Sequence, residues 1–266
     1  MKTLFRIVGY GFFVYLILGV LINLFKVASQ PASSCREYSL RDKKTKDCSH
    51  FRNWELPQTK TEFCTNYRSQ QSVSDQRELE RNAIVENGID YNNYWGSVYR
   101  HLVDQNKDYV RFVADSLRQI SRNENFDPTQ FAELIVSFVQ DIPYSYVLGD
   151  ECRSTKTGKH PCVGNVAFGI LSPYEFIHSL YGDCDTRAVL LYALFEDLGF
   201  RPMIVVSNEY AHAMLALDIP STGNFIMHNR DKFYFWETTA TGWTAGMLPP
   251  DMNNINYWKI ALVNEL

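Results

Sequence analysis

The sequence has no strong excess of charge of either sign. Its 26 basic and 30 acidic residues give a formal net charge of −4, and basic residues form no stripe along the chain. Because nucleic-acid binding depends on clustered positive charge, the composition argues against a nucleic-acid partner. Internal repeats and low-complexity tracts are also absent, so the 266 residues fit one sizeable domain with appendages.

The sequence also lacks an Asp-x-Asp-x-Asp-Gly loop, the pattern typical of a calcium-binding EF-hand. Cysteines are few. If one of the six is a free catalytic thiol, five remain and one of these has no partner within the chain. The cysteines besides this candidate thiol favour an oxidising compartment for the body of the protein. We leave the pairing open among Cys35, Cys48, Cys64, Cys152 and Cys162.

One long hydrophobic run, Ile7 to Phe25, contains no charged residue. As a helix it would span about 28 Å, close to the thickness of a hydrocarbon core. We expect residues 1–29 to hold an uncleaved single-pass membrane anchor. A signal peptide cleaved near Val27-Ala28-Ser29 is the alternative, although its apolar region is usually shorter. Basic residues lie on both sides of the run, so only the cysteines favour a periplasmic or cell-surface body.

Residues 30–89 are polar, with few aliphatic side chains and three of the six cysteines. This composition predicts an irregular stalk. Two of its cysteines could form a disulfide that orders it. Its aromatic residues Phe51, Trp54 and Phe63 could dock on the main domain, which we assign to residues 90–266.

Helical patterns begin the main domain. Apolar residues follow a broken helical period from Tyr94 to Ser121, and Asp127-Pro128 predicts the start of a second helix that ends before Ile142-Pro143. Ser172-Pro173-Tyr174-Glu175 is a capping box that predicts a short helix through Leu180.

Residues 147–166 are rich in turn-forming residues and contain Cys152 and Cys162, ten positions apart. We expect a loop closed by a disulfide between these two cysteines. The alternative is a metal site formed by both cysteines and His160. That spacing matches no common zinc pattern, and a fourth ligand is missing.

Cys184 begins a helical pattern that runs from Gly182 to Gly199. A cysteine on the first turn of a helix lies against backbone N–H groups and the positive end of the helix dipole. Both favour thiolate over thiol, so we expect a lowered thiol pKa and a nucleophile. The alternative is a small buried thiol at the start of a core helix, because free cysteine is among the most buried residue types.

Beyond Gly199 the period changes from helical to alternating, with β-branched and aromatic residues between turns. Four short strands are predicted at 202–207, 212–218, 224–228 and 232–238. Helices followed by strands predict an α+β fold, in which an antiparallel meander packs on the Cys184 helix.

A cysteine nucleophile needs a base, and the base needs an orienting group. His212 begins the second predicted strand and Glu237 ends the fourth. Strand ends of a meander can meet beside the Cys184 helix, which would give a Cys–His–acid triad. The structural alternatives are a strand-edge histidine bonded to backbone and an exposed strand-end carboxylate. The competing bases are His160, His178 and His228.

Four segments resemble the transglutaminase-like superfamily of cysteine enzymes, particularly its bacterial and archaeal cysteine peptidases. Together they extend over about residues 90–250. The segments are Phe-Val-Gln-Asp-Ile-Pro-Tyr (138–144), Gly-Asp-Cys-Asp-Thr-Arg-Ala-Val-Leu-Leu (182–191), His-Ala-Met-Leu-Ala-Leu (212–217) and Trp-Glu-Thr-Thr-Ala-Thr-Gly-Trp (236–243).

The resemblance implies a papain-like core with Cys184 as nucleophile, His212 as general base and Glu237 as the third member of the triad. The family more often has aspartate at the third position, so the side chain here is one methylene longer. The family often has an acidic pair after the cysteine, whereas Asp185-Thr186 follows here. In the first segment Gln140 is our candidate oxyanion donor, beside the Cys184 N–H; the alternative is a solvent-exposed glutamine at a helix end.

These residues predict a cysteine hydrolase that acts on the amide bonds of a protein or peptide through a thioester. Transfer to an amine, as in a crosslinking transglutaminase, is the alternative, and a non-catalytic binding or scaffold protein is the competing class. The chemistry needs no metal or organic cofactor. The substrate and the oligomeric state stay open.

Overall fold

The computed structural model describes residues 37–84, 89–90, 93–153, 157–158 and 160–264. Contacts divide the chain into two units, Met1–Cys35 and Arg36–Leu266, and the second unit is described below. Within the described ranges, no helix has both the length and the apolar character needed to cross a membrane. The predicted anchor at residues 7–25 lies outside these ranges.

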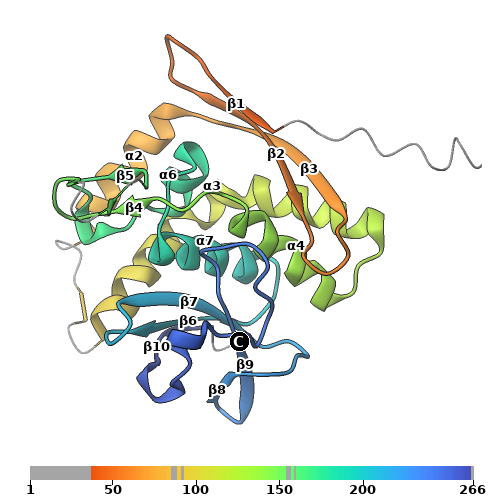
Figure 1. Cartoon of the computed structure of the whole chain (residues 1–266). Coiled ribbons are helices and arrows are strands. Elements are labelled where there is room, and N and C mark those ends of the chain that lie inside the picture. Colours follow the sequence, from red (N-terminus) through yellow and green to blue (C-terminus); the bar gives the residue numbers. More distant parts are fainter. Residues whose placement is uncertain (1–36, 85–88, 91–92, 154–156, 159, 265–266) are drawn as a thin grey trace, which may run out of the picture. The chain divides into compact units, whose positions relative to one another are not determined.

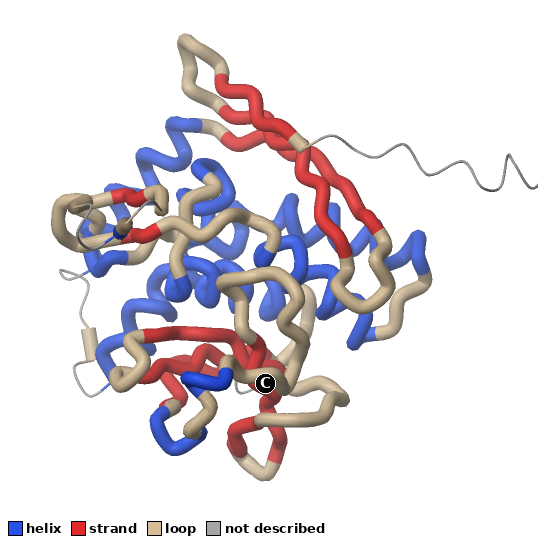
Figure 2. The backbone as a smooth tube through the Cα atoms, in the orientation of Figure 1, coloured by secondary structure: helices blue, strands red, loops and turns tan. Residues whose placement is uncertain are grey.

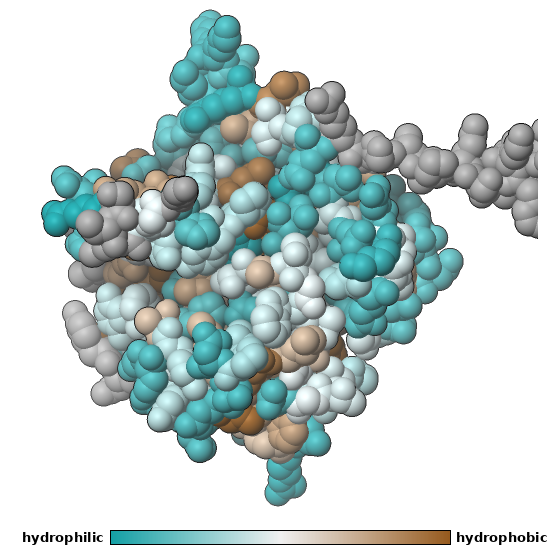
Figure 3. All heavy atoms as spheres, in the orientation of Figure 1, coloured by the Kyte–Doolittle hydropathy of each residue, from teal (hydrophilic) through white to brown (hydrophobic). Residues whose placement is uncertain are grey.

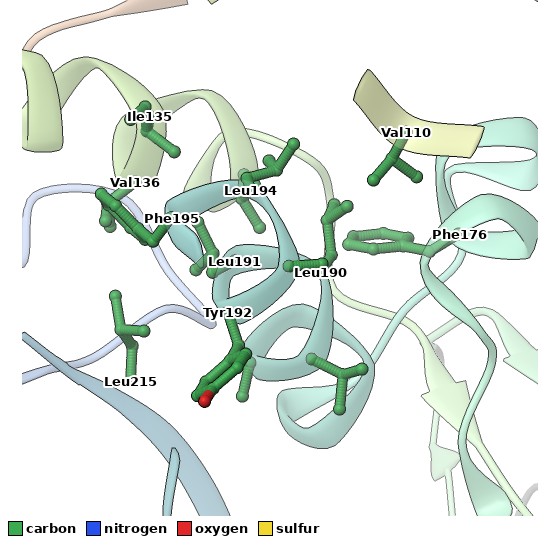
Figure 4. Packing of buried hydrophobic residues seen from close by; sticks show 14 of the residues in the cluster. Val110, Ile135, Val136, Phe176, Leu190, Leu191, Tyr192, Leu194, Phe195 and Leu215 are labelled. Atoms are coloured by element: carbon green, nitrogen blue, oxygen red, sulfur yellow. The ribbon is translucent and has the colours of Figure 1, made fainter. Parts of the chain in front are cut away.

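The central element is the helix α7 (Cys184–Asp197), whose residues 186–195 are all buried in the core. In Figure 4 its side chains Leu190, Leu191 and Phe195 point toward residues from the surrounding elements. The helices that pack around it are α3 (Tyr94–Glu124), α4 (Pro128–Gln140) and α6 (Pro173–Ser179).

Local capping sets the helix starts as the sequence predicts. Asp127 and Gln130 form a capping box at α4, and Ser172 and Glu175 form another at α6. In each case proline occupies the first turn, where its missing N–H is no loss. The predicted helices at these positions are confirmed.

A five-stranded antiparallel sheet packs against α7, below the helices in Figure 1. Its order is β10-β6-β7-β9-β8, so β9 lies between β7 and β8 and the predicted meander order is wrong. The α+β class and the antiparallel pairing are confirmed. The strands are β6 (Pro202–Ser207), β7 (His212–Leu217), β8 (Phe225–His228), β9 (Asp231–Trp236) and β10 (Lys259–Val263).

Alternating side chains divide the sheet between two cores. Leu215 and Leu217 of β7 join the core around α7, whereas Met214 and Ala216 face the opposite side. There they pack with residues of the C-terminal segment, including Trp258. The His212 ring, at the start of β7, lies against Trp258 of this segment.

The prediction of an irregular segment at residues 30–89 is wrong for its described part. Residues 38–69 form an antiparallel sheet, drawn as the upper red hairpin in Figure 2, and a helix follows it. The inward face of the middle strand carries His50 and Arg52 beside Trp54, which hides its hydrophobic alternation. The elements are β1 (Tyr38–Arg41), β2 (Cys48–Glu55), β3 (Glu62–Ser69) and α2 (Gln71–Asn82).

The predicted docking of aromatic residues from this segment is confirmed for two of three. Trp54 and Phe63 belong to the main core, whereas Phe51 is only partly buried. Cys48 is a buried free thiol and Cys64 is disulfide-bonded, while Cys35 lies outside the described residues.

The loop after α4 is closed by a Cys152–Cys162 disulfide, as predicted. Both sulfurs are therefore used, which excludes the alternative metal site with His160. Within the loop β4 (Tyr146–Val147) pairs in parallel with β5 (Cys162–Val163). Short 3₁₀ turns follow here and near the C-terminus, at Ala167–Gly169, Pro250–Met252 and Ile255–Tyr257.

The face of the molecule in Figure 3 is mostly hydrophilic. Apolar atoms occur there in small, separated groups, and the loop between β1 and β2 projects as a hydrophilic tip. This face therefore shows no large apolar patch of the kind that marks a docking surface.

Candidate active site

The first turn of α7 presents Cys184 beside the sheet. The side chain of Asp183 accepts a hydrogen bond from the Thr186 N–H (3.1 Å), which caps the helix one residue before the cysteine. Gly182 packs so closely on the Phe176 ring that an added Cβ would lie 2.7 Å from it. The turn into α7 therefore needs glycine, and Cys184 is left only 7% exposed.

His212 and Glu237 lie at the same end of two neighbouring inner strands. β7 and β9 are antiparallel neighbours, with Leu215 opposite Trp236, so the start of β7 meets the end of β9. His212 Nε2 and Glu237 Oε2 are 2.8 Å apart, and their side chains are 9% and 3% exposed. The structure thus joins the predicted base to the predicted acid.

The thiol of Cys184 contacts the start of β7. The backbone N–H of Ala213, next to His212 in the chain, donates a hydrogen bond to the Cys184 sulfur. Because Glu237 occupies Nε2 of His212, the ring nitrogen left for proton exchange with the thiol is Nδ1. The Cys184 sulfur therefore contacts the residue next to His212, and His212 contacts Glu237.

Glu237 is held as a carboxylate. Its Oε1 accepts hydrogen bonds from the backbone N–H of Thr238 (2.8 Å), and from the N–H and hydroxyl of Thr239 (both 2.7 Å). Burial raises the pKa of Glu237. The hydrogen bond and charge of His212 and the bonds from Thr239 outweigh this effect and lower the pKa to about 2. A fixed negative charge therefore faces the His212 ring.

The expectation of a lowered Cys184 pKa is wrong in this structure. Burial, followed by the negative charges of Asp185 and Asp183, raises the pKa of the thiol well above its ordinary value. The hydrogen bond from Ala213 acts in the opposite direction and is outweighed. The helix end does supply N–H groups, but two carboxylates and a dry environment oppose them.

The side-chain amide of Gln140 donates to other groups, which argues against the predicted oxyanion role. Its Nε2 donates to the main-chain oxygens of Glu237 (2.7 Å) and Trp243 (3.0 Å). Its side chain is buried, so the solvent-exposed alternative is also wrong. The Trp236 indole donates to the same Trp243 oxygen (3.0 Å), so Gln140 helps to fold the loop that carries Glu237.

The three competing histidines of the sequence prediction contact other groups. The His160 ring lies against Tyr144 and Tyr146. His178 bonds Ser69 and Gln71, and His228 lies 3.1 Å from the Asn229 amide. His212 is the candidate base that the structure shows paired with a carboxylate, Glu237.

Arg187 was missed by the sequence analysis. It is fully buried, and its guanidinium donates to four main-chain oxygens, which belong to Gly182, Val139, Thr238 and Ile142. Burial is the main reason that its pKa falls to about 10. It connects the Cys184 turn to the Glu237 loop. In the sequence, its position one helical turn after Cys184 is the feature that could have predicted a role near the site.

Three further side chains surround the nucleophile. Asp185 accepts a hydrogen bond from the Cys184 thiol (3.3 Å) and another from the Tyr99 hydroxyl. Tyr144 lies with its ring 5.8 Å from the Arg187 guanidinium carbon. Burial, then the charges of Cys184 and Asp183, raise the Tyr144 pKa, so its hydroxyl stays protonated.

Comparisons of the chain with protein-family models, with curated proteins and with solved structures found no match. What this site can do therefore follows from its own geometry.

Proposed function

We propose that this protein is a cysteine peptidase or amidase of the transglutaminase-like type, with a papain-like α+β core. One observation carries the proposal: Cys184, on the first turn of a buried helix, lies beside a His212–Glu237 pair joined at 2.8 Å. Nucleophile, base and orienting carboxylate are the three parts that thiol-dependent acyl transfer requires.

The reaction begins when His212 Nδ1 takes the thiol proton and the Cys184 sulfur attacks an amide carbonyl carbon. The Cys184 N–H, at the helix end, donates to the oxyanion. The C–N bond then breaks, the amine leaves with the proton from Nδ1, and a thioester remains. Water attacks next, gives a proton to Nδ1 and releases the acid, and the sulfur recovers the proton.

Tyr144 takes the oxyanion role that Gln140 cannot fill. A phenol donates only while it is protonated, and burial and neighbouring negative charge raise the Tyr144 pKa. Its segment is held next to the nucleophile turn by a hydrogen bond from the Ser145 N–H to the Gly182 oxygen (3.2 Å). The second nucleophile is water, because hydrolysis needs no additional groove for an amine.

The proposed setting is a membrane surface, with residues 7–25 as a single-pass anchor and the catalytic domain periplasmic or on the cell surface. The Cys152–Cys162 disulfide supports an oxidising compartment. Extraction with alkaline carbonate tests the anchor: an anchored chain stays with the membrane pellet, whereas a cleaved one is released.

A non-catalytic binding protein is the second candidate, favoured by the raised pKa and burial of the Cys184 thiol. Such a protein has no use for a histidine paired with a buried carboxylate beside that thiol. We therefore place catalysis first.

The deciding experiment uses an activated ester, p-nitrophenyl acetate, and mass spectrometry. Cys48 is a second free thiol, so every variant carries Cys48→Ser. We expect an acetyl thioester on the peptide that contains Cys184, formed far more slowly in His212→Ala. If no thioester forms, or if it forms equally fast without His212, the enzyme hypothesis fails.

A further inference from the structure

The Cys184 thiol donates a hydrogen bond to a neighbouring carboxylate. Its Sγ lies 3.3 Å from Asp185 Oδ2 and donates to it, although His212 is the group that must accept this proton during catalysis. A thiol has one hydrogen, so a bond to Asp185 and proton transfer to His212 exclude each other.

The Asp185 carboxylate is itself fixed by α3. The Tyr99 hydroxyl donates to Asp185 Oδ1, and the Tyr99 side chain is completely buried. One oxygen of the carboxylate is therefore anchored on the neighbouring helix, and the other faces the sulfur. Asp185 occupies the position directly after the nucleophile, so its contact with the sulfur is local.

We infer that Asp185 is a positioning residue that holds Cys184 as a neutral thiol in the resting site, with Tyr99 fixing its carboxylate. This inference rests on the proposed function, since it describes the protonation state of the nucleophile before substrate binds. Turnover then requires the S–H to leave Asp185 and turn to His212 Nδ1, and the resting thiol is protected from indiscriminate reaction.

Groups from every side of the sulfur bear on this assignment. On α7 and its cap they are Asp183, Asp185 and Arg187; on α3 it is Tyr99. Tyr144 lies on the loop after α4. The start of β7 and the end of β9 contribute the remaining groups, which are His212, the Ala213 N–H and Glu237.

Among these groups Asp185 differs from the others in its direct contact with the thiol. Arg187 spends its donors on main-chain oxygens, and Asp183 caps the helix through Thr186. Asp185 is the one carboxylate here with a hydrogen bond to the sulfur in the described part of the chain. Its removal should therefore release the thiol more than removal of Asp183.

The test is the rate of iodoacetamide alkylation of Cys184 against pH, in the full chain with Cys48→Ser. Asp185→Asn keeps an amide oxygen for Tyr99 and removes the charge. We expect its alkylation profile to move at least one pH unit lower, which is about a tenfold faster reaction below the pKa. Asp183→Asn retains the cap and removes the neighbouring carboxyl, whose pKa burial and the Asp185 charge raise to about 7. It is the control, and its expected shift is smaller.

If Asp185→Asn fails to fold, the double variant Asp185→Ala/Tyr99→Phe removes both partners together and should show the same shift. A profile that superimposes on that of the parent overturns the inference, as does an equal shift in Asp183→Asn. Loss of thioester formation in every variant, with the Asp185→Asn shift intact, contradicts the proposed function and leaves the Asp185 contact standing.

Discussion

Replacement of Glu237 by glutamine should reverse the roles of the two His212 nitrogens. Three donors, from Thr238 and Thr239, already bind Oε1 of Glu237 and will keep the oxygen of a glutamine in the same place. The new NH₂ group then faces His212 Nε2 and donates to it. The ring proton must move to Nδ1, the nitrogen that has to accept the thiol proton.

The catalytic consequence is large. A base that holds the wrong tautomer cannot take the proton, and the comparable change in serine proteases costs about 10⁴-fold in kcat. We expect Glu237→Gln to slow acetyl thioester formation from p-nitrophenyl acetate by about 10³-fold to 10⁴-fold, with the fold intact by circular dichroism.

The stability consequence follows from the pKa of Glu237. Its fall from the ordinary 4.5 to about 2 corresponds to roughly 3 kcal/mol of folded-state stability. Because the folded-state pKa is the lower one, this stability is present above about pH 4.5 and is lost as the pH falls toward 2. At pH 3 roughly 2 kcal/mol of it has gone.

Urea denaturation of the parent and Glu237→Gln at pH 7 and pH 3 measures this difference. The variant should be less stable by roughly 3 kcal/mol at pH 7 and by roughly 1 kcal/mol at pH 3. Glu62→Gln, at the exposed start of β3, is the control for loss of one carboxylate. A gap between parent and variant that stays constant with pH would refute the assignment of Glu237 as a buried carboxylate paired with His212.

The remaining predictions concern the residues around the triad. Arg187→Met removes a donor from four main-chain oxygens, of which those of Gly182 and Val139 keep a backbone donor, and should cost about 3 kcal/mol or more in urea denaturation. Gln140→Leu should lose about 1–3 kcal/mol because it frees the Glu237 loop, whereas an oxyanion donor would lose activity at unchanged stability. Tyr144→Phe should lower kcat for the activated ester about 10²-fold at unchanged stability; a normal kcat excludes it as an oxyanion donor. Opening the Cys152–Cys162 disulfide by double serine substitution should cost at most about 3 kcal/mol, and a larger loss would mean that the loop supports the core.

Local features of this protein could be predicted from the sequence because their partners are close in the chain. The capping boxes of α4 and α6 join residues three positions apart. The strands β6 to β9 follow from alternation over a few residues, and the Cys152–Cys162 bridge closes a short loop. The nearness of His212 to Glu237 followed from placing both at strand ends.

Tertiary structure decided what depends on distant partners. Gln140 bonds a main-chain oxygen 97 residues away, so nothing near it in the sequence distinguishes a loop clamp from an oxyanion donor. β9 lies between β7 and β8, which local pattern cannot specify. The hairpin of β2 and β3 escaped prediction because it buries polar side chains against the core.

The nucleophile shows both sides of this division. Its sequence places Cys184 on the first turn of a helix, where backbone N–H groups lower a thiol pKa. Burial and the fixed carboxylates raise that pKa instead, and Tyr99, which orients Asp185, comes from a helix 86 residues earlier. Residue types and spacing identified the candidate nucleophile. The packing of α3, α7 and the sheet decided its protonation, because desolvation and charge depend on three-dimensional neighbours.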